Sequence, residues 1–413
     1  MSRRVVVTGV GAVSPVGNDV RTSWQALLAG KSGVSRLTLF DPSALAVQIG
    51  GQVKDLDTEQ FIEAKDLRRM DRNVQFAVVA TGEALQDAKL AITPENSEEV
   101  GCIIGSAIGG IKTLLDSQKT FDEKGPSRVS PFFLQNLIPD TASGQVAITF
   151  GAKGPNLAVV SACATGAHAI GEATETIRRG DATVMLAGGT EAAIVPVVVA
   201  GFTVMRALAQ NNDSPETASR PFDLTREGFV MAEGCAMLIL EELEHALARD
   251  AHIYCEVAGY GSTNDAFHLA APAENGEGAA RAMSVAIRRA GLAPTDVDYI
   301  NAHGTGTPLN DKYETAAIKT AFGDHAYRLA VSSTKSMTGH MMGAAGAFEL
   351  MVCALALCHQ VIPPTINYRH PDPDCDLDYV PNEARAASLD VVMSNSLGLG
   401  GHNGSLILRR PEF

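Results

Sequence analysis

Cys163 is the residue best placed in this sequence to act as a nucleophile. An apolar run stops at this cysteine, and small, helix-forming residues follow it as far as His168. We predict a strand, a sharp turn and a helix, with the thiol at the turn, where free backbone N–H groups and the helix dipole lower its pKa. The same amides could bind the oxyanion of an attacked carbonyl. A buried, inert cysteine is the alternative, since free cysteines are among the most buried residues.

Two histidines have a setting that suits hydrogen bonding to a ligand. His303 lies in the segment NAHGTGTP, and His340 lies in SSTKSMTGH, which leads into a helix rich in glycine and alanine that contains Glu349. Each follows a predicted strand and has a glycine next to it. A neutral imidazole in such a place can donate one hydrogen bond to a carbonyl oxygen. For either histidine alone, a satisfied position in the core is the favoured interpretation.

The elements around these residues predict an α/β protein. The spacing of apolar residues predicts alternating strands and helices, with a long amphipathic helix near the start. The predicted strands are Val5–Val7 before a glycine turn at Gly9, Gly101–Gly105, Thr183–Gly189 and Cys235–Leu240; the predicted helices are Ser23–Gly30, Glu63–Lys89 and Glu241–Arg249; and Pro126–Pro139 is predicted as a loop.

The pattern then starts again, which indicates an internal duplication. The segment Leu157–Cys163 aligns with Leu329–Lys335, and Asp181–Gly189 aligns with Asp390–Gly398. We therefore expect two similar halves, residues 1–250 and 251–413. Cys163 and Lys335 would be counterparts at the interface of the halves, where pockets commonly lie.

Composition narrows the class of protein further. The chain has 413 residues, of which 46% are hydrophobic and 19% charged, as in a folded enzyme with more than one core. The seven cysteines are scattered without a CxxC pair, which favours free thiols in a reducing compartment and no metal site. We found no signal peptide and no apolar run of the roughly 20 residues that span a membrane, so we expect a cytoplasmic protein without membrane insertion.

The net charge of −14 argues against nucleic acid as a partner. Four basic residues, Lys65, Arg68, Arg69 and Arg72, nevertheless recur at the spacing of one helix face. They form either a solvated surface or a docking site for an acidic partner, because a local positive patch can steer association.

Three motifs together resemble the Cys-His-His signature of the condensing enzymes of the thiolase superfamily. They are SACATG around Cys163, NAHGTGTP around His303 and SSTKSMTGHMMGAAG around His340. The resemblance is strongest to the β-ketoacyl-[acyl-carrier-protein] synthases of type II and extends over essentially the whole chain. It implies a thiolase fold of five α-β-α-β-α layers, built from two duplicated halves, and a homodimer.

The resemblance also implies a reaction. Cys163 would accept an acyl group from acyl carrier protein, and His303 and His340 would stabilise the enolate formed when malonyl-carrier protein loses carbon dioxide. The carbanion would attack the acyl-cysteine, with the amides of Cys163 and Leu399 binding the oxyanion. The product is a 3-oxoacyl-carrier protein, elongated by two carbons. No cofactor is implied apart from the phosphopantetheine that the carrier protein itself holds.

Further residues match the family by position. Lys335 and Glu349 would form a buried ion pair that sets the local field and holds His340. Substrate-binding positions are implied for Ile108, Phe133, Phe202, His268, Thr305, Thr307 and Gly400, and a carrier-protein docking patch for Lys65, Arg68, Arg69 and Arg206. This match favours the docking interpretation of the basic residues.

One departure from the family concerns Leu399. The family usually has phenylalanine there, as a gate to the acyl pocket, so we expect a smaller and more flexible gate. A thiolase or a condensing enzyme for coenzyme A substrates would lack the second histidine, and the duplication does not fit a papain-like protease. A polyketide-type ketosynthase and a non-catalytic partner subunit of such a system remain as alternatives.

Overall fold

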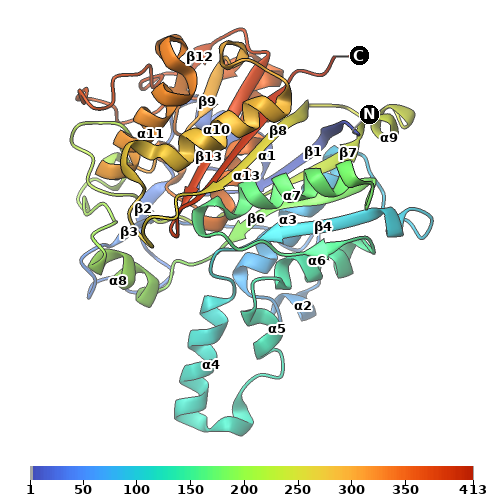
Figure 1. Ribbon diagram of the computed structural model, residues 1–413. Coiled ribbons are helices and arrows are strands. Elements are labelled where there is room, and N and C mark those ends of the chain that lie inside the picture. The colour runs from blue at the N-terminus through green and yellow to red at the C-terminus, as the bar shows by residue number, and fades with distance from the viewer. Residues whose placement is uncertain (1–2, 413) are drawn as a thin grey trace.

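The computed structural model describes residues 3–412 and is built on a ten-stranded sheet (Figure 1). The strands of the first half are β1 (Val5–Val13), β4 (Val100–Gly105), β5 (Asn156–Leu157), β6 (Val184–Glu191) and β7 (Gly234–Glu242). Those of the second half are β8 (Cys255–Asn264), β9 (Tyr299–Asn301), β10 (Ala330–Ser332), β13 (Val391–Gly398) and β14 (His402–Arg409).

The two halves have the same strand topology. From the centre outward, the order is β1-β7-β6-β4-β5 in one half and β8-β14-β13-β9-β10 in the other. β4 runs parallel to β5 and β6, as β9 runs parallel to β10 and β13. The halves join where β1 pairs antiparallel with β8.

Helices cover and separate the two halves of the sheet. The central helices α7 (Thr165–Arg179) and α13 (Ala345–His359) contact each other and strands of both halves, whereas α3 (Arg72–Asp87) packs on β1 and β7, and α10 (Glu277–Ala290) packs on β8 and β14. This gives the five expected α-β-α-β-α layers (Figure 1). The mixed α/β thiolase fold is therefore confirmed.

The remaining elements connect these layers. The helices are α1 (Val20–Leu28), α2 (Ala64–Leu67), α4 (Ile111–Lys124), α5 (Phe133–Leu137), α6 (Thr141–Phe150), α8 (Pro196–Val204), α9 (Leu243–Ala248), α11 (Pro308–Phe322) and α12 (Lys335–Thr338). The 3-10 helices are η1 (Ser97–Glu99), η2 (Pro126–Arg128), η3 (Ala162–Ala164), η4 (Pro215–Thr217), η5 (Glu274–Gly276), η6 (Pro294–Asp296), η7 (Gly323–Tyr327) and η8 (Met342–Ala344). Two small sheets pair β2 (Val34–Arg36) with β3 (Ile49–Gly51) and β11 (Val361–Ile362) with β12 (Arg385–Ala386).

The predicted glycine turn at Gly9 is wrong, because β1 continues through it to Val13. The glycines of this strand instead allow a helix to approach the backbone. A Cβ atom on Gly11 would lie 1.9 Å from the carbonyl oxygen of Ala80 in α3, and one on Gly261 would lie 2.0 Å from that of Ala282 in α10. Both halves thus use glycine for the same close packing of helix on strand.

The predicted equivalence of Cys163 and Lys335 is also wrong. Cys163 lies in η3, directly before α7, and the corresponding place before α13 is Gly343 in η8. The preceding residues, Ala162 and Met342, share a left-handed φ of 50°. Lys335 begins α12, an additional helix between β10 and η8. The extra residues shifted the sequence alignment away from the true counterpart.

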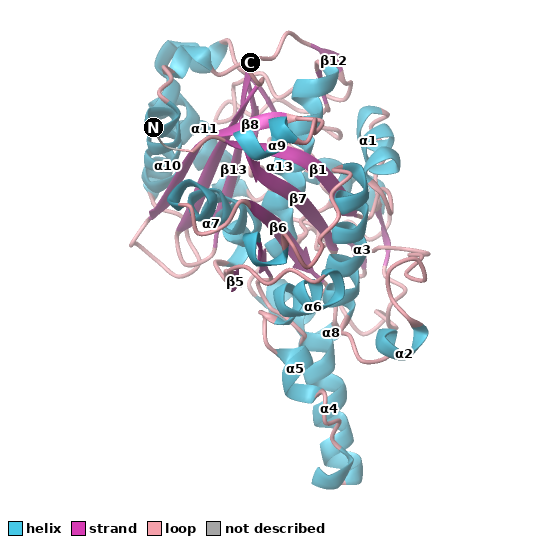
Figure 2. Ribbon diagram, turned by 90° about the vertical axis from the view of Figure 1, so that its right-hand side faces the viewer, coloured by secondary structure: helices cyan, strands magenta, loops and turns pink. Residues whose placement is uncertain are grey.

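Other predicted boundaries need smaller corrections. The strand expected to reach Cys163 ends at Leu157, and the helix expected over Glu63–Lys89 is broken into α2 and α3. Asp71 caps α3 by accepting a hydrogen bond from the amide of Arg72. The loop expected over Pro126–Pro139 contains α5, which joins α4 in an arm that projects from the body (Figure 2).

One helical segment, Met342–His359, is apolar and long enough to cross a membrane by composition. In this fold, however, 89% of that segment is buried inside the protein. Most of it is α13, which packs against α7 and against strands of both halves, so its apolar character is explained by its place in the central layer.

Candidate active site

A cavity of about 420 Å³ brings together the sequence-predicted reactive residues. Its lining includes Cys163 from η3, His303 from the loop after β9, His340 from the loop before η8, and Leu399 from the turn between β13 and β14. Residues from both halves of the chain therefore meet at one site. Phe202, Arg206, Thr305, Thr307 and Gly400 also line this cavity.

The backbone holds Cys163 at a strained turn directly before the central helix α7. Ala162 has the left-handed φ of 50°, which is unfavourable for a residue with a side chain and recurs at functional sites. Burial raises the pKa of the Cys163 thiol to about 11, and the Lys335 charge and the backbone N–H groups of Leu399 and Cys163 act in the opposite direction. The amides therefore face the thiol as expected, but the predicted net lowering of its pKa is wrong, because burial dominates.

The rings of His303 and His340 form a pair of neutral hydrogen-bond donors. Burial, together with the nearby Lys335 charge, holds the pKa of both histidines well below the ordinary value of 6.5. No hydrogen-bond partner within residues 3–412 reaches Nδ1 of His303 or either ring nitrogen of His340. Both imidazoles line the cavity and are uncharged, and these three buried nitrogens have no partner among the described residues.

Both histidines are fixed through their backbone and neighbours. The Glu314 side chain accepts hydrogen bonds of 2.8 Å from the amides of His303 and Gly304. The amide of His340 donates to the carbonyl of Val230 at 2.7 Å, and the His340 ring packs edge-on against Phe229 with centroids 5.3 Å apart. The rings themselves remain available to face the cavity.

Lys335 and Glu349 form a buried ion pair behind the cavity. Their side chains are 1% and 2% exposed, and Lys335 Nζ donates a hydrogen bond to Glu349 Oε1. The expected ion pair is present. The expectation that it holds His340 by direct contact is wrong, because the His340 ring nitrogens have no hydrogen-bond partner among the described residues. The pair acts on both histidines and Cys163 through the Lys335 charge.

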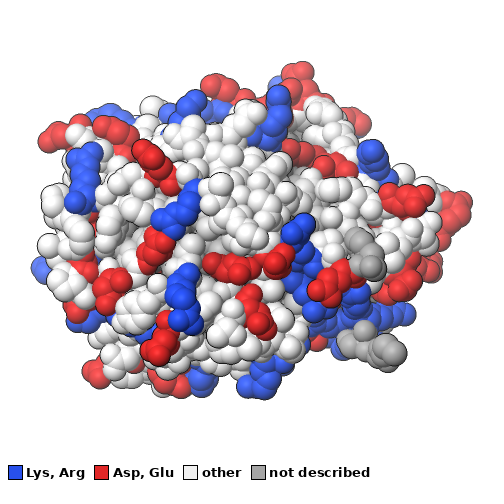
Figure 3. Space-filling view, turned by 90° about the horizontal axis from the view of Figure 1, so that it is seen from above, with Lys and Arg blue, Asp and Glu red and all other residues white. Residues whose placement is uncertain are grey.

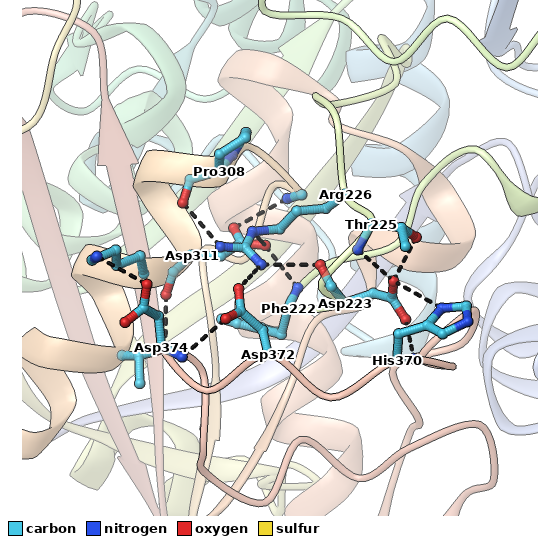
Figure 4. A network of polar contacts seen from close by, with 12 residues as sticks. Phe222, Asp223, Thr225, Arg226, Pro308, Asp311, His370, Asp372 and Asp374 are labelled. Atoms are coloured by element: carbon cyan, nitrogen blue, oxygen red, sulfur yellow. Dashed lines mark hydrogen bonds and ion pairs between the residues drawn. The ribbon is translucent and has the colours of Figure 1, made fainter.

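A polar network fixes the loop that carries Thr305 and Thr307 (Figure 4). The buried guanidinium of Arg226 donates to the carbonyls of Thr307 and Pro308 and to the carboxylate of Asp372. Asp311 accepts hydrogen bonds from the amides of Phe222 and Gly306. The two threonine hydroxyls lie 3.2 Å apart at the cavity wall, so they form a prepared pair of hydrogen-bonding groups.

The turn that carries Leu399 is joined to the loop that follows β8. The amide of Gly400 donates to the carbonyl of Leu269 at 2.8 Å, and Asn403 donates to the Asp265 carboxylate at 2.7 Å. The Leu399 side chain is 36% exposed at the cavity mouth. Its small size and exposure are compatible with a mobile gate.

Three predicted substrate-binding residues do not line the cavity. Ile108 packs against the same hydrophobic cluster as Phe202 and lies outside the lining. Phe133 is in the projecting arm, in α5. His268 is exposed and accepts hydrogen bonds from the amides of Ala270 and Ala271. Within one chain, these three side chains are therefore not brought to Cys163.

The basic residues do not share one helix face. Lys65, Arg68 and Arg69 are exposed on or next to α2, whereas Arg72 turns inward and forms an ion pair with the buried Glu233. The helix break before Arg72 explains the difference. Arg206 lies apart from them at the cavity.

Sequence reasoning missed several residues that shape the site. They are Glu314 and Arg226, which fix the loops of His303 and the threonines, Phe229 beside His340, and Glu191, a fully buried carboxylate at the end of β6. An acidic residue at the end of a strand of mostly apolar and small residues was the available signal for Glu191. The partners of Arg226 are too distant in sequence to give one.

Positive and negative charges are mixed on the face of the molecule that Figure 3 shows. On the face seen from above, basic and acidic side chains are interspersed (Figure 3). Within the part of the chain that the structure describes, no group of three or more His, Cys, Asp or Glu side chains is arranged to hold a metal ion.

Two family models match most of the chain. Residues 2–246 match the model of the beta-ketoacyl synthase N-terminal domain, and residues 254–369 match that of the C-terminal domain. A 3-oxoacyl-[acyl-carrier-protein] synthase 2 from Synechocystis is 53% identical over 410 residues, covering 99% of both chains. One of the same name from Staphylococcus aureus is 51% identical over 411 residues, covering 100% of this chain and 99% of that one.

Solved structures give the same result. A beta-ketoacyl synthase from Burkholderia phymatum superposes with a TM-score of 0.92 at 36% identity, covering 99% of this chain and 100% of the other. A ketosynthase complex with a type II polyketide synthase acyl-carrier protein, bound to the hexaketide, also superposes with a TM-score of 0.92 at 36% identity over the full length of both chains.

Proposed function

This chain belongs to the beta-ketoacyl synthase family, and we propose that Cys163, His303 and His340 carry out its reaction. The protein is an acyltransferase of fatty acid synthesis, a 3-oxoacyl-[acyl-carrier-protein] synthase. It condenses an acyl group with malonyl-carrier protein, releases carbon dioxide and lengthens the chain by two carbons.

In the first half-reaction, the sulfur of Cys163 attacks the thioester carbonyl of the acyl group. The new bond joins Sγ to the acyl carbon, and the bond between that carbon and the sulfur of the carrier breaks. The proton of the thiol ends on the departing carrier thiol. The amides of Cys163 and Leu399 are suited to bind the oxyanion of the tetrahedral intermediate, since both face the thiol.

In the second half-reaction, the malonyl group loses carbon dioxide, and its thioester oxygen gains negative charge. Two neutral imidazoles at the cavity, those of His303 and His340, would stabilise this enolate more than the neutral starting material. The carbanion then attacks the acyl-cysteine carbonyl and forms the new carbon–carbon bond, and Sγ leaves as a thiolate that takes up a proton from water. Decarboxylation supplies the carbanion, so the reaction needs no strong base and, in our proposal, no resident cofactor.

The remaining predicted residues have supporting roles in this proposal. Thr305 and Thr307 would bind the phosphopantetheine arm that the carrier protein brings, because their hydroxyls lie together at the cavity wall. Lys65, Arg68, Arg69 and Arg206 would contact the acidic carrier protein. Among solved structures, a similar ketosynthase is in complex with its acyl-carrier protein, which supports such a partner.

We further propose a cytoplasmic homodimer built from duplicated halves, residues 1–250 and 251–413. The edge strand β5 is exposed, with Leu157 at 60% and nearby Val160 at 55% exposure. An apolar sheet edge of this kind is suited to pairing with a second copy. In such a dimer, Phe133 of the arm could reach the acyl pocket of the other subunit, although it lies outside the cavity of its own.

The observation that carries the proposed function is the convergence of Cys163 with two neutral, buried histidines in one cavity. An elongation assay with malonyl-carrier protein and acyl-carrier proteins of increasing length, read by mass spectrometry, tests it. We expect products two carbons longer and a stoichiometric acyl adduct on Cys163. Products absent at every length would contradict fatty acid elongation.

The polyketide alternative differs in substrate rather than in chemistry. The relatives named 3-oxoacyl-[acyl-carrier-protein] synthase 2 are 51–53% identical, against 36% for the ketosynthase bound to the hexaketide. This favours fatty acid elongation. A non-catalytic partner subunit would lack the nucleophile, whereas Cys163 is present.

A further inference from the structure

Glu191 is a fully buried carboxylate at the end of β6 that binds two separate segments. It accepts hydrogen bonds from the Ser106 hydroxyl at 3.0 Å and from the amides of Ala107 at 2.8 Å and Ile108 at 3.3 Å. It also accepts one from the amide of Gly343 at 3.1 Å. The first segment joins β4 to α4, and the second is η8, three residues after His340.

The pseudo-symmetry of the fold relates the position of Glu191 to a position beside Cys163. β6 and β13 both have eight residues, so the last residue of one, Glu191, corresponds to the last residue of the other, Gly398. The sequence alignment of Gly189 with Gly398 is therefore wrong by two residues. A Cβ on Gly398 would lie 3.1 Å from the amide nitrogen of Cys163. Glu191 in turn binds the amide of Gly343, the counterpart of Cys163. The duplication has thus produced two corresponding backbone amides, those of Cys163 and Gly343. The amide of Cys163 lies at the reacting thiol, whereas the amide of Gly343 donates to the carboxylate of Glu191.

The segments that Glu191 joins lie behind the cavity wall. Ile108 and Met342, next to the bound amides, pack in the hydrophobic cluster to which Phe202 and Phe229 of the cavity lining also belong. The backbone there has no spare room, because a Cβ on Gly343 would lie 2.6 Å from the amide nitrogen of Ala107. Loss of the Glu191 hydrogen bonds would therefore move or loosen Ile108 and the wall that depends on it.

We propose that Glu191 is a positioning residue that fixes Ile108 and the adjacent wall of the acyl pocket, and so sets which chain lengths Cys163 accepts. This inference rests on the proposed function. It concerns selectivity between acyl chains rather than the decarboxylation step, because His303 and His340 are held by Glu314 and Val230 instead.

The test compares Glu191→Gln with the wild type. Glutamine keeps the size of the side chain, but its NH₂ group cannot accept and would face the donors that now bind the carboxylate. Glu83→Gln is the matched control, because Glu83 is a carboxylate that accepts two backbone amides, from Ala12 and Val20, away from the cavity. The kcat/KM for loading Cys163 is measured over a series of acyl-carrier proteins, together with the release of carbon dioxide from malonyl-carrier protein.

We expect Glu191→Gln to reduce the ratio of kcat/KM between the preferred acyl chain and the next longer, disfavoured one about tenfold, since hydrogen bonds that the buried carboxyl group accepts are lost. Carbon dioxide release should stay within about twofold, and Glu83→Gln should leave the ratio unchanged. A Glu191→Gln protein with the wild-type ratio, or with all lengths slowed equally, would overturn the inference.

Ser106→Ala keeps the test decisive if Glu191→Gln does not fold. It removes one donor to Glu191 and should shift the same ratio in the same direction by about threefold, and an unchanged ratio would overturn the inference. A wild-type protein that neither loads Cys163 nor releases carbon dioxide would overturn the proposed function together with the inference. Wild-type activity with an unaltered variant profile would overturn the inference alone.

Discussion

The rings of His303 and His340 lie with their centroids 5.3 Å apart and their planes at 87° to each other. Two neutral donors in this arrangement can approach one oxygen from different directions. Each is held by a separate backbone contact, His303 through Glu314 and His340 through Val230. Removing one ring should therefore leave the other in its place.

We expect His303→Ala and His340→Ala each to slow malonyl decarboxylation by about 10²- to 10³-fold, as for loss of one donor to a developing oxyanion. Acyl transfer to Cys163 should fall much less, because in our proposal the amides of Cys163 and Leu399 stabilise the oxyanion of that step. Carbon dioxide release and acyl-enzyme formation are measured separately, with Cys163→Ala as the control that abolishes only acylation. Equal loss in both steps would contradict the division of roles.

The depressed histidine pKa values also predict a pH dependence of stability. His303 and His340 stay neutral in the folded protein, while the unfolded chain takes up protons near pH 6.5. Stability should therefore be fully present above pH 6.5 and be lost as the pH falls below it, by up to about 1.4 kcal/mol per pH unit for each histidine. The free energy of unfolding of the wild type and of His340→Asn, measured from pH 8 to pH 5, tests this.

The comparison between the two proteins isolates the histidine, because the buried carboxylates titrate in both. The slope below pH 6.5 should be shallower in His340→Asn by about the contribution of one group. Identical slopes would mean that His340 binds a proton in the folded state, and hence that it is not the neutral donor we describe.

The reactive residues could be predicted from the sequence because each lies in a distinctive local motif. Cys163, His303 and His340 converge as expected, and the strand topology repeats in the two halves. Local motifs do not reveal contacts between distant residues. Arg72 was predicted as part of the surface patch, but it pairs with Glu233, which is 161 positions away.

Short sequence similarities between the halves gave a wrong alignment where one half has extra residues. The sequence matched Cys163 with Lys335, because both follow a similar strand and precede a Thr-Gly segment. The additional helix α12 displaces the true counterpart to Gly343. The role of Glu191 could not be predicted from the sequence for a related reason. Glu191 binds the amide of Gly343, and the two residues come close only in the folded chain.

The buried pair of Lys335 and Glu349 predicts a large effect of single substitutions. Lys335→Met leaves the Glu349 carboxylate buried without its partner and should destabilise the protein by about 3–5 kcal/mol. The double variant Lys335→Met/Glu349→Leu should recover most of that loss. Denaturant unfolding of the two single variants and the double variant measures the coupling, and a double variant as unstable as Lys335→Met would contradict it.

The same double variant tests the effect of the Lys335 charge on Cys163 separately from the effect of the ion pair on stability. Loss of the Lys335 charge removes one of the influences that lower the pKa of Cys163, so the thiolate fraction at a given pH should fall. Alkylation of Cys163 by iodoacetamide at pH 8 should slow about tenfold for each unit by which that pKa rises. The wild-type rate in a stable double variant would mean that the charge does not reach the thiol.

Leu399 leads to a prediction on selectivity at the other end of the pocket. Its side chain is partly exposed at the cavity mouth, on a turn held to the opposite loop by the hydrogen bond between Gly400 and Leu269. Leu399→Phe adds a ring that closes more of this mouth, while the backbone amide that faces Cys163 is retained. We expect a narrower range of accepted acyl chains, with kcat/KM for the bulkiest chains reduced about tenfold, because overfilling a pocket costs on the order of 1–3 kcal/mol. The elongation assay over a series of acyl-carrier proteins measures the range. An unchanged acyl-chain profile would show that the leucine does not relax the gate.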